Sequence, residues 1–289
     1  MPPRDRSGTV VDGRYHLEAR IGRGASAEVY RAVDGATGGA VAIKILRGAD
    51  TRDDESAARF QREAEVQAMV RHHNVAGLYG NGMTEAAEPY LVVELLRGAS
   101  LRDRLRERGA VSASTAVTYI WQTLQGLAAV HARGILHRDL KPANLMLEPS
   151  PGPVERVVLI DFGFAAFEGG KSLTRRGHVV GSLTYLAPER QRGETADPRS
   201  DLYAVGVIFH ELLAGAPPFD GDDDFDIITA HLGDDPPDLI TVAPIPPPAA
   251  VCAIVRRALA KDRAARFADA TAMADAVGEC AATLPPPAP

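Results

Sequence analysis

The segment from Ile135 to Leu147 constrains the fold more than any other part of the sequence. It reads I-L-H-R-D-L-K-P-A-N-L-M-L, so Asp139, Lys141 and Asn144 lie within six residues between two apolar runs. Because both flanks can be anchored in a core, the sequence predicts charged side chains held on a rigid scaffold. A carboxylate base, a compact cation and a metal-binding amide at these spacings suit phosphoryl transfer. The loop alone would also fit a turn with capping Asp and Asn residues.

Composition excludes several classes of protein. The 289 residues are 45% hydrophobic and 24% charged, as in an ordinary soluble globular chain, and the net charge of −6 gives no reason to expect nucleic-acid binding. No apolar run approaches the roughly 18 residues of a membrane span, and residues 1–13 lack a signal-peptide core. Cys252 and Cys280 fit no metal-ligand spacing, so we expect free thiols in a reducing compartment. These observations predict a cytoplasmic chain with no membrane segment and no nucleic-acid partner.

Lysine is rare in this arginine-rich chain and occurs only at positions 44, 141, 171 and 261. Its compact ammonium, in contrast to the planar fork of arginine, suits contact with phosphate in a tight site. Lys44 lies within the apolar run A-V-A-I-K-I-L, where a buried ammonium needs a carboxylate partner unless it snorkels from a strand edge. The predicted helix at 53–71 offers Glu63 as the preferred partner, with Glu65 as the fallback.

A glycine turn joins two predicted strands near the beginning of the chain. We expect strands at 15–21 and 28–34, connected through Gly22 and Gly24, whose backbone N–H groups could cradle phosphate. A dinucleotide-binding fold would need a helix directly after these glycines. The β-branched and aromatic residues that follow favour a returning strand instead, which argues against a dinucleotide-dependent oxidoreductase.

The remaining sequence alternates helical patterns with short strands. The helix predicted at 112–133 repeats its apolar residues with a 3.6-residue period and places Trp121 on the buried face. Asp161 ends the apolar run V-V-L-I-D just before F-G, which suits either a metal ligand or a turn former. The other predicted features are strands at 74–79 and 90–95, a linker at about 94–99, a helix from Ser100, a buried helix from Asp201, helices at 222–232, 249–259 and 269–279, and a loop at 234–248.

Several motifs occur in a fixed order: G-R-G-A-S-A-E-V, A-I-K, H-R-D-L-K-P-A-N, D-F-G, A-P-E and D-L-Y-A-V-G. Together they resemble the protein kinases, specifically the eukaryotic-like bacterial serine/threonine kinases. The resemblance implies an α+β, bilobal fold with a small antiparallel β-sheet N-lobe, one main helix in that lobe, and a larger, mostly α-helical C-lobe. It implies a kinase domain at 14–278, with an N-lobe at about 14–94 and a C-lobe at about 97–278. The Pro-, Arg- and Gly-rich composition of residues 1–13 separately predicts a disordered segment, and a proline-rich tail occupies 281–289.

The implied activity is that of a serine/threonine protein kinase, which transfers the γ-phosphoryl group of ATP to proteins and phosphorylates its own activation loop. Asp139 would accept or orient the proton of the substrate hydroxyl group, and Lys141 would neutralise the transferring phosphoryl group. Lys44 would hold the α- and β-phosphates while paired with Glu63. Proteins with exposed Ser or Thr are therefore the implied substrates.

ATP and a divalent cation are the implied cofactors. Asn144 and Asp161 would bind Mg²⁺, with Mn²⁺ as an alternative ion. Val29 and Ala42 would cover the adenine, with Met146 beneath it. The other implied nucleotide contacts are the glycine-loop residues Ile21, Gly22, Arg23, Gly24, Ala25, Ser26 and Ala27 and the backbone of Glu94 and Leu96.

The resemblance also implies regulatory and supporting residues. Thr174, in an irregular stretch at 164–180, is expected to be phosphorylated in trans within a transient dimer, and Arg138 would pair with its phosphate. Glu189 would pair with Arg266 in a structural role, and Asp201 would support the catalytic loop.

Two alternatives of other classes remain open at this point. A catalytically weak pseudokinase scaffold would bind nucleotide or partners without phosphoryl transfer, although Lys44, Asp139, Asn144 and Asp161 are all present. A small-molecule phosphotransferase of related fold would differ in the substrate-docking segment, where A-P-E and its arginine partner favour a protein kinase.

Overall fold

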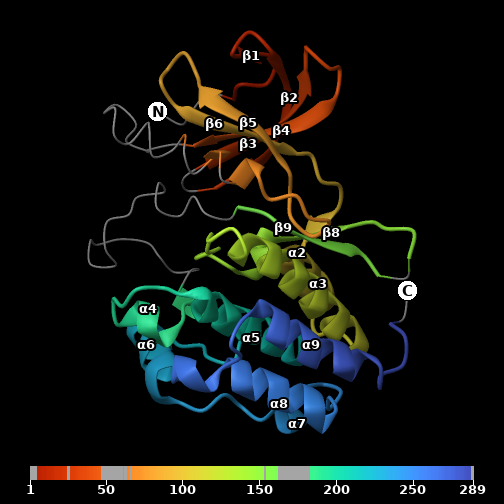
Figure 1. Cartoon of the computed structure of the whole chain (residues 1–289), viewed down its shortest axis with the longest axis vertical. Helices are drawn as coiled ribbons and strands as arrows, with labels where there is room; N and C mark the ends of the chain where they lie inside the picture. Colours follow the sequence, from red (N-terminus) through yellow and green to blue (C-terminus); the bar gives the residue numbers. More distant parts are fainter. Residues whose placement is uncertain are drawn as a thin grey trace. The chain divides into compact units, whose positions relative to one another are not determined.

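A computed structural model of the chain describes residues 5–24, 27–46, 61, 64–65, 67–152, 154–161 and 183–287. These residues form two compact units (Figure 1). The first unit contains the described residues up to His72 together with Ala76–Leu96, and the second contains His73–Val75 and the described residues from Arg97 to 161 and from 183 onward. The chain leaves the first unit between Leu96 and Arg97, inside the linker predicted at 94–99.

The first unit is built on an antiparallel sheet with the strand order β1-β2-β3-β4-β6-β5. The strands are β1 (Val10–Val11), β2 (Tyr15–Arg23), β3 (Ala27–Asp34), β4 (Ala40–Leu46), β5 (Leu78–Met83) and β6 (Pro89–Glu94). The returning strand after the glycine turn is confirmed, because β3 pairs antiparallel with β2 and places Val29 opposite Gly22.

The two faces of this sheet carry different side chains, because successive residues of a strand point to opposite faces. One face, called here the aromatic face, carries Tyr15, Leu17, Tyr30, Ala32, Val41, Ile43, Ile45, Tyr90 and Val92, joined by Val11. The other face carries a smaller cluster of Ala27, Leu46, Ala64 and Leu91. Lys44 is opposite Leu91 in the β4–β6 register and therefore belongs to this second face.

Residues 5–13 form an ordered strap on the aromatic face. This corrects the expectation of disorder at 1–13 for those members of the segment that the structure describes. β1 pairs with β2 and buries Val11, the Arg6 guanidinium donates to Glu88 Oε2 at 2.6 Å, and the Tyr90 hydroxyl donates to Asp12 Oδ2 at 2.7 Å. The polar composition of the segment suggested disorder. The partners that order it lie more than 70 residues away in sequence, so the local sequence does not reveal them.

Asp12 is the residue whose loss should loosen this strap. Its φ of 55° lies in the left-handed region, which Asp and Asn tolerate better than Ala. Burial and the Asp12 carboxylate both raise the pKa of Tyr90, so the Tyr90 hydroxyl remains a donor. We expect Asp12→Ala to lower the free energy of unfolding by about 2 kcal/mol, and Asp12→Asn, which keeps an oxygen acceptor, by less than about 1 kcal/mol. Equal losses for the two variants in urea unfolding would contradict this role.

The second unit is mostly helical. Its α-helices are α2 (Leu101–Arg108), α3 (Ala113–His131), α4 (Pro188–Gln191), α5 (Pro198–Ala214), α6 (Asp224–Gly233), α7 (Leu239–Val242), α8 (Ala249–Ala258) and α9 (Ala270–Ala281). A small sheet of order β7-β8-β9 consists of β7 (Ala99–Ser100), β8 (Leu145–Glu148) and β9 (Arg156–Leu159). The described residues of the unit also form the 3-10 turns η1 (Pro142–Asn144), η3 (Leu183–Tyr185) and η4 (Arg263–Ala265). The antiparallel sheet of the first unit and the helices of the second confirm the predicted α+β class.

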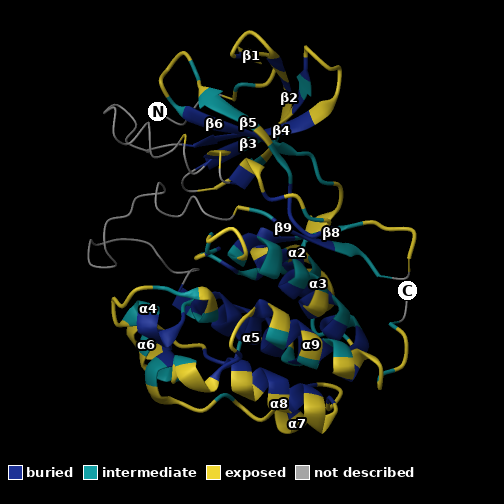
Figure 2. Ribbon diagram, viewed as in Figure 1, coloured by how far each residue is buried: buried dark blue, intermediate teal, exposed yellow. Residues whose placement is uncertain are grey.

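Helix α5 occupies the core of the second unit, as its continuous apolar composition predicts. Every residue from Ser200 to Leu213 is buried, whereas exposed residues of the unit gather on turns and outer helix faces (Figure 2). The helix begins at Pro198, earlier than the predicted Asp201, because Asp197 supplies the N-cap and proline is favoured in the first turn. Its last residue is Ala214, and the C-cap Gly215, whose φ of 81° is left-handed, terminates it.

Helix α3 is buried along a narrower stripe than its sequence suggests. Ser112 caps the helix by accepting a hydrogen bond from the Thr115 N–H. The buried stripe includes Ile120 and Leu124, but Trp121 is 42% exposed, so the prediction that it lies in the core is wrong. Its indole packs beside Gly278 of α9, at the border of the stripe, where a large amphipathic ring can keep one edge in water.

Two further differences from the predicted elements have identifiable causes. The strand predicted at 74–79 runs instead over Leu78–Met83, because Asn74 is bonded to β9 of the second unit. Asn74 Nδ2 donates to the Val157 carbonyl at 2.8 Å, and the Asn74 carbonyl accepts from the Leu159 N–H at 2.9 Å. Within the loop predicted at 234–248, Asp238 caps the single helical turn α7. None of the described helices combines the length and the apolar character needed to cross a membrane.

Candidate active site

The catalytic candidates of the 135–147 segment lie together in the second unit. Asp139 Oδ2 accepts a hydrogen bond from Lys141 Nζ at 2.6 Å, and Asn144 Nδ2 donates to the Asp139 carbonyl at 2.7 Å and to Asp139 Oδ2 at 3.2 Å. The turn η1 brings Asn144 back to Asp139, because the Asn144 N–H bonds to the Lys141 carbonyl. Asp139 and Lys141 are each about one-quarter exposed, which leaves the carboxylate and the ammonium accessible to a substrate.

Asp201 of α5 holds the backbone on which Asp139 is mounted. Its carboxylate accepts hydrogen bonds from the N–H groups of His137 and Arg138, both at 2.9 Å, and from His131 Nε2 at 2.8 Å. Burial raises the pKa of Asp201, but the His131 hydrogen bond, the neighbouring His137 and the Arg138 N–H outweigh that effect and hold the pKa below its ordinary value. An ionised carboxylate therefore fixes Arg138 at a φ of 66°, a left-handed conformation that is costly for arginine.

Asp161 follows the strand that runs beside this turn. The Ile160 N–H donates to the Asn144 carbonyl at 3.0 Å, so the residue just before Asp161 is bonded to one of the predicted metal ligands. Asp161 is exposed and has a φ of 60°, which again marks a backbone held in an unusual conformation. Met146 lies on β8 opposite Val158 of β9 and is partly exposed.

The donor atoms of Asn144 and Asp161 fit a hard divalent cation. The Asn144 amide nitrogen donates to Asp139, so the amide oxygen is the Asn144 atom that could bind a cation. Asp161 could bind a cation through its carboxylate. Oxygen ligands are the ones that Mg²⁺ prefers, and it commonly keeps only one or two of them from protein and takes phosphate oxygens for the rest. Among the described residues, no cluster of three or more His, Cys, Asp or Glu side chains could hold a metal ion.

In the first unit, the predicted nucleotide residues share one sheet face. Val29 of β3 lies opposite Lys44 of β4 in an antiparallel register, and Ala42 is two residues before Lys44 on the same strand. Antiparallel partners point to the same side of a sheet, and so do residues two apart on a strand. Lys44 is only 6% exposed, so the buried-lysine interpretation of A-V-A-I-K-I-L is supported.

The glycines of the turn have few close neighbours among the described residues. A Cβ added at Gly24 would lie 3.8 Å from the Ala27 carbonyl oxygen, and one added at Gly22 would lie 3.5 Å from the Val29 side chain. The Gly24 N–H is bonded to the Ala27 carbonyl at 2.8 Å, which closes the turn. Ile21 and Arg23 lie on β2, with Ile21 54% exposed.

The end of β6 carries the predicted base contacts. The Glu94 N–H donates to the Gly77 carbonyl at 2.8 Å, and Glu94 Oε2 accepts from the Gly77 N–H at 3.1 Å. Leu96 is the last residue of the first unit and is partly exposed.

The sequence also predicted the buried pair Glu189–Arg266. Arg266 donates from both terminal nitrogens to the Glu189 carboxylate, at 2.9 and 2.8 Å, and the Ser200 hydroxyl donates to Glu189 Oε1 at 2.7 Å. Burial raises the pKa of Glu189, and the hydrogen bonds from Arg266 and Ser200 lower it further than burial raises it. This pair fixes α4, which begins at Pro188 of the A-P-E motif, to the core of the second unit.

Sequence reasoning missed a second buried charge cluster. The Tyr185 hydroxyl donates to Glu211 Oε2 at 2.6 Å, and Arg102 donates to Glu211 Oε1 at 2.9 Å and to the Tyr185 hydroxyl. Burial and Glu211 raise the pKa of Tyr185, which keeps the phenol protonated. The available signal was Glu211 inside an otherwise apolar helix, because a buried carboxylate requires a partner.

Four of the predicted site residues lie outside the described residues. They are Ala25, Ser26, Glu63 and Thr174. The Lys44–Glu63 pair and the phosphate on Thr174 therefore stay predictions.

Comparison with known proteins covers nearly the whole chain. The family model described as "Protein kinase domain" matches residues 15–275. The chain is 34% identical over 290 residues to serine/threonine-protein kinase PknA of Mycobacterium tuberculosis, and this alignment covers 98% of the chain and 65% of that protein. It is 36% identical over 277 residues to the probable serine/threonine-protein kinase PknB of Corynebacterium glutamicum, covering 93% of the chain and 42% of that protein.

The similarity extends to a solved structure. The crystal structure of the PknI kinase domain of Mycobacterium tuberculosis matches with a TM-score of 0.74 and 30% sequence identity, covering 94% of this chain and 98% of that one. The chain thus has the extent of a kinase domain, and it spans less than two thirds of the length of the curated relatives named above.

Proposed function

This chain belongs to the protein kinase domain family, and from that premise we propose that it transfers the γ-phosphoryl group of ATP to serine or threonine hydroxyl groups of proteins. The curated relatives named above are serine/threonine kinases, which supports this acceptor class. Because the reaction consumes ATP, we place the domain in the cytoplasm.

The observation that carries the proposal is the joint position of Asp139, Lys141 and Asn144 on a backbone held by α5. Asp139 accepts hydrogen bonds from both of the other side chains, so a base, a cation and an amide lie within hydrogen-bond distance of one another. Asp139 would take or orient the proton of the substrate hydroxyl as the phosphoryl group arrives. Lys141 would balance the charge on the phosphoryl oxygens, a task that electrostatic preorganisation performs well.

The family implies nucleotide contacts in each unit separately. In the first unit, Lys44 would offer a nearly buried ammonium to the phosphates, and Val29 and Ala42 would offer apolar surface to the base. In the second unit, Asn144 and Asp161 would offer oxygen ligands to a divalent cation. Bound Mg²⁺ would neutralise the β- and γ-phosphate oxygens. Glu63 is proposed as the carboxylate partner of Lys44.

The experiment that tests this function is transfer of labelled γ-phosphate from Mg-ATP to a generic protein substrate. Label is expected on serine and threonine, at a turnover of about 1–100 s⁻¹ for the active enzyme, and EDTA should abolish it. A chain that binds ATP but transfers no label would favour the pseudokinase alternative. Label that reaches only a small metabolite would favour the small-molecule alternative.

We also propose that Thr174 is phosphorylated in trans within a transient dimer and that Arg138 pairs with its phosphate. Arg138 is exposed and lies next to Asp139, so a phosphate there could order the substrate segment near the base. Phosphopeptide mapping after incubation with Mg-ATP should find Thr174 occupied, with initial rates that rise more steeply than linearly with enzyme concentration. Occupancy of Ser172 alone, or rates proportional to enzyme concentration, would contradict the proposal.

A further inference from the structure

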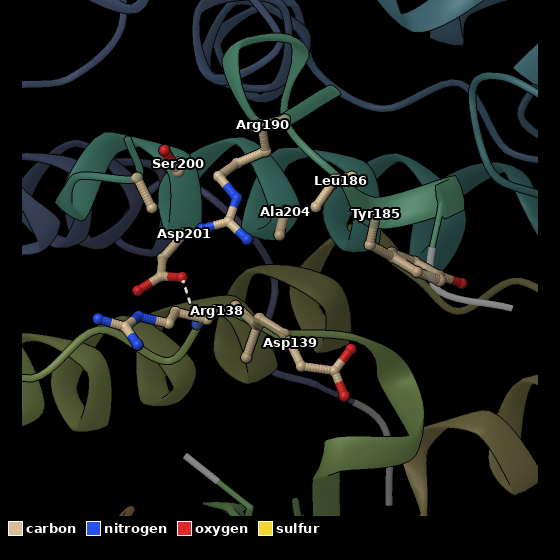
Figure 3. A pocket seen from close by; sticks show the side chains of 11 residues that line it. Arg138, Asp139, Tyr185, Leu186, Arg190, Ser200, Asp201 and Ala204 are labelled. Carbon is tan, nitrogen blue, oxygen red and sulfur yellow. Dashed lines mark hydrogen bonds between the residues drawn. The ribbon is translucent and has the colours of Figure 1, made fainter. Parts of the chain in front are cut away.

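Glu28 of β3 is a buried carboxylate that none of the proposed nucleotide or catalytic contacts uses. It is 1% exposed, and a carboxylate at that depth is costly unless cations and hydrogen-bond donors compensate it. Asp201 of the second unit is also buried, and it supports the catalytic segment through bonds such as the one to the Arg138 N–H (Figure 3). The contacts of Glu28 indicate a comparable supporting role beside the glycine turn of the first unit.

Two arginines of β2 compensate the charge of Glu28. Arg20 Nη1 lies 3.6 Å and Arg23 Nε lies 3.9 Å from Glu28 Oε1. Arg23 is the residue between Gly22 and Gly24, and Glu28 is its partner in the β2–β3 register. The carboxylate therefore connects β3 to a residue flanked by two glycines, where the backbone has the most conformational freedom to lose.

The other oxygen of Glu28 connects to the strap at 5–13. The Tyr30 hydroxyl donates to Glu28 Oε2 at 3.1 Å, and the Arg6 N–H of the strap donates to the same hydroxyl at 3.3 Å. Burial raises the pKa of Tyr30, and the Glu28 carboxylate raises it too, so the phenol stays protonated and remains a donor. The strap thus holds Tyr30, and Tyr30 holds Glu28 in place beside the two arginines.

Glu28 and the predicted nucleotide residues lie on opposite faces of the sheet. Glu28 and Tyr30 are two residues apart on β3, so they share the aromatic face. Val29, between them, is opposite Lys44 in the β3–β4 register and shares the other face with it. Any effect of Glu28 on a nucleotide must therefore pass through the backbone of the glycine turn.

We propose that Glu28 is a positioning residue for the phosphates of the nucleotide, and that it acts by holding the glycine turn through Arg20 and Arg23. A turn that is already ordered loses less conformational entropy when its N–H groups meet phosphate, so the affinity for phosphate rises without any added contact. The inference rests on the proposed function in one respect, because the ligand of the turn is the ATP of that reaction.

The first test compares a ligand that has phosphates with one that has none. Mg-ADP and adenosine are titrated by calorimetry into the unaltered chain and into Glu28→Gln, which keeps an acceptor for the Tyr30 hydroxyl but removes the charge. We expect the affinity for Mg-ADP to fall about fivefold, and that for adenosine to stay within about twofold. In transfer assays, the KM for ATP should rise by the same factor with kcat unchanged. An equal loss for the two ligands would indicate general damage to the sheet and would refute the role.

Arg23→Gln tests the same ion pair from its exposed side, because the Arg23 side chain is 47% exposed and its replacement leaves the core intact. It should also weaken binding of Mg-ADP and not of adenosine. The double variant should lose no more than Glu28→Gln alone, because both changes break one pair. Losses that multiply in the double variant would show that the two residues act independently, contrary to the proposal.

Glu18→Gln is the matched control. Glu18 pairs with Arg31 Nε at 2.7 Å across the same two strands, but both side chains are exposed and neither flanks the glycines. Its affinity for Mg-ADP should equal that of the unaltered chain within about twofold. A loss as large as that of Glu28→Gln would mean that any charge removed from this hairpin has the same effect.

A measurement without nucleotide separates this inference from the proposed function. The Gly24 N–H donates to the Ala27 carbonyl at 2.8 Å, so its hydrogen-exchange rate reports the order of the turn. By NMR, Glu28→Gln should speed this exchange about fivefold and Glu18→Gln should not. Unchanged Gly24 exchange would overturn the positioning role even in an active kinase. A chain that transfers no phosphate but retains these differences in exchange and in Mg-ADP affinity would contradict the proposed function and support the role of Glu28.

Discussion

Replacing Asp139 by Asn is expected to lower kcat for phosphoryl transfer by roughly a thousandfold while leaving the fold intact. A loss of this size is typical when a general base or a proton-orienting group is removed from an active site. The change keeps the size of the side chain, so the packing around η1 is preserved.

The physical reason lies in the bonds that Asp139 makes. Its Oδ2 accepts from Lys141 Nζ at 2.6 Å and from Asn144 Nδ2 at 3.2 Å. An amide can still accept one of these hydrogen bonds through its oxygen, but it cannot take a proton from a substrate hydroxyl, and it does not carry the charge that balances Lys141. The loss should therefore be in kcat, with the apparent affinity for ATP changed little.

The measurement is steady-state transfer of labelled phosphate, with ATP binding measured separately by calorimetry. Asp222→Asn is the matched control, because Asp222 is exposed and makes no described hydrogen bond, and its rate should equal that of the unaltered chain. Thermal melts of both variants should lie within about 2 °C of the unaltered chain, as expected for surface or isosteric changes. Near-normal transfer by Asp139→Asn would refute the catalytic assignment.

Replacing Arg266 by Ala should be the most destabilising single change among those considered, at about 3–5 kcal/mol. Arg266 is fully buried and forms a two-bond pair with Glu189, which is 2% exposed. Its guanidinium also donates to the Ala260 and Arg199 carbonyls and lies 4.8 Å from the centre of the Tyr203 ring. Truncation leaves the Glu189 carboxylate buried with only the Ser200 hydroxyl as a side-chain donor, an uncompensated charge that the core cannot solvate.

A domain of this size is expected to lose about 2–4 °C in Tm per kcal/mol, so the melting temperature of Arg266→Ala should fall by roughly 10 °C. Arg263→Ala is the matched control, because Arg263 has the same side chain but is partly exposed in its pairs with Glu194 and Asp197. Its loss should cost less than about 1 kcal/mol. Similar melting temperatures for the two variants would contradict the assigned role of the buried pair.

The same pair has a pH signature. The pKa of Glu189 lies below its ordinary value of 4.5 in the folded chain, so its ionised form contributes stability above that value and the contribution is lost as the pH falls through the lowered pKa. The difference in unfolding free energy between the unaltered chain and Arg266→Ala should therefore shrink below about pH 4.5. A difference independent of pH would indicate that packing, and not charge, dominates the loss.

The site chemistry within the 135–147 segment could be predicted because it depends on short sequence separations. Asn144 reaches Asp139 through a five-residue turn, and Lys141 reaches it across two residues, so the local chain geometry already places the three groups together. The helix caps at Ser100, Ser112 and Asp269 follow the same logic, because each accepts a hydrogen bond from an N–H three residues onward.

The errors occurred where partners lie far apart in sequence. The strap at 5–13 was expected to be disordered, yet Arg6 and Asp12 are satisfied by Glu88 and Tyr90 of the β5–β6 region. Trp121 was expected in the core because it is large and apolar, but the packing of α9 through Gly278 leaves it at the edge. Hydrophobic periodicity indicates which face of a helix is apolar. It does not indicate how much of that face a neighbouring element will cover.

The sequence by itself determined the groups that carry the chemistry and the local turns that bring Asp139, Lys141 and Asn144 together, because residues two to five apart have few conformations to choose from. The tertiary structure decided how those groups are held, through contacts that the resemblance to the kinase family implied but that no local sequence pattern shows. Asp201 reaches the N–H groups of His137 and Arg138 across more than 60 residues, and Arg266 reaches Glu189 across 77. Such pairings depend on which buried faces pack together, since a buried charge is stable only where the whole core delivers its partner.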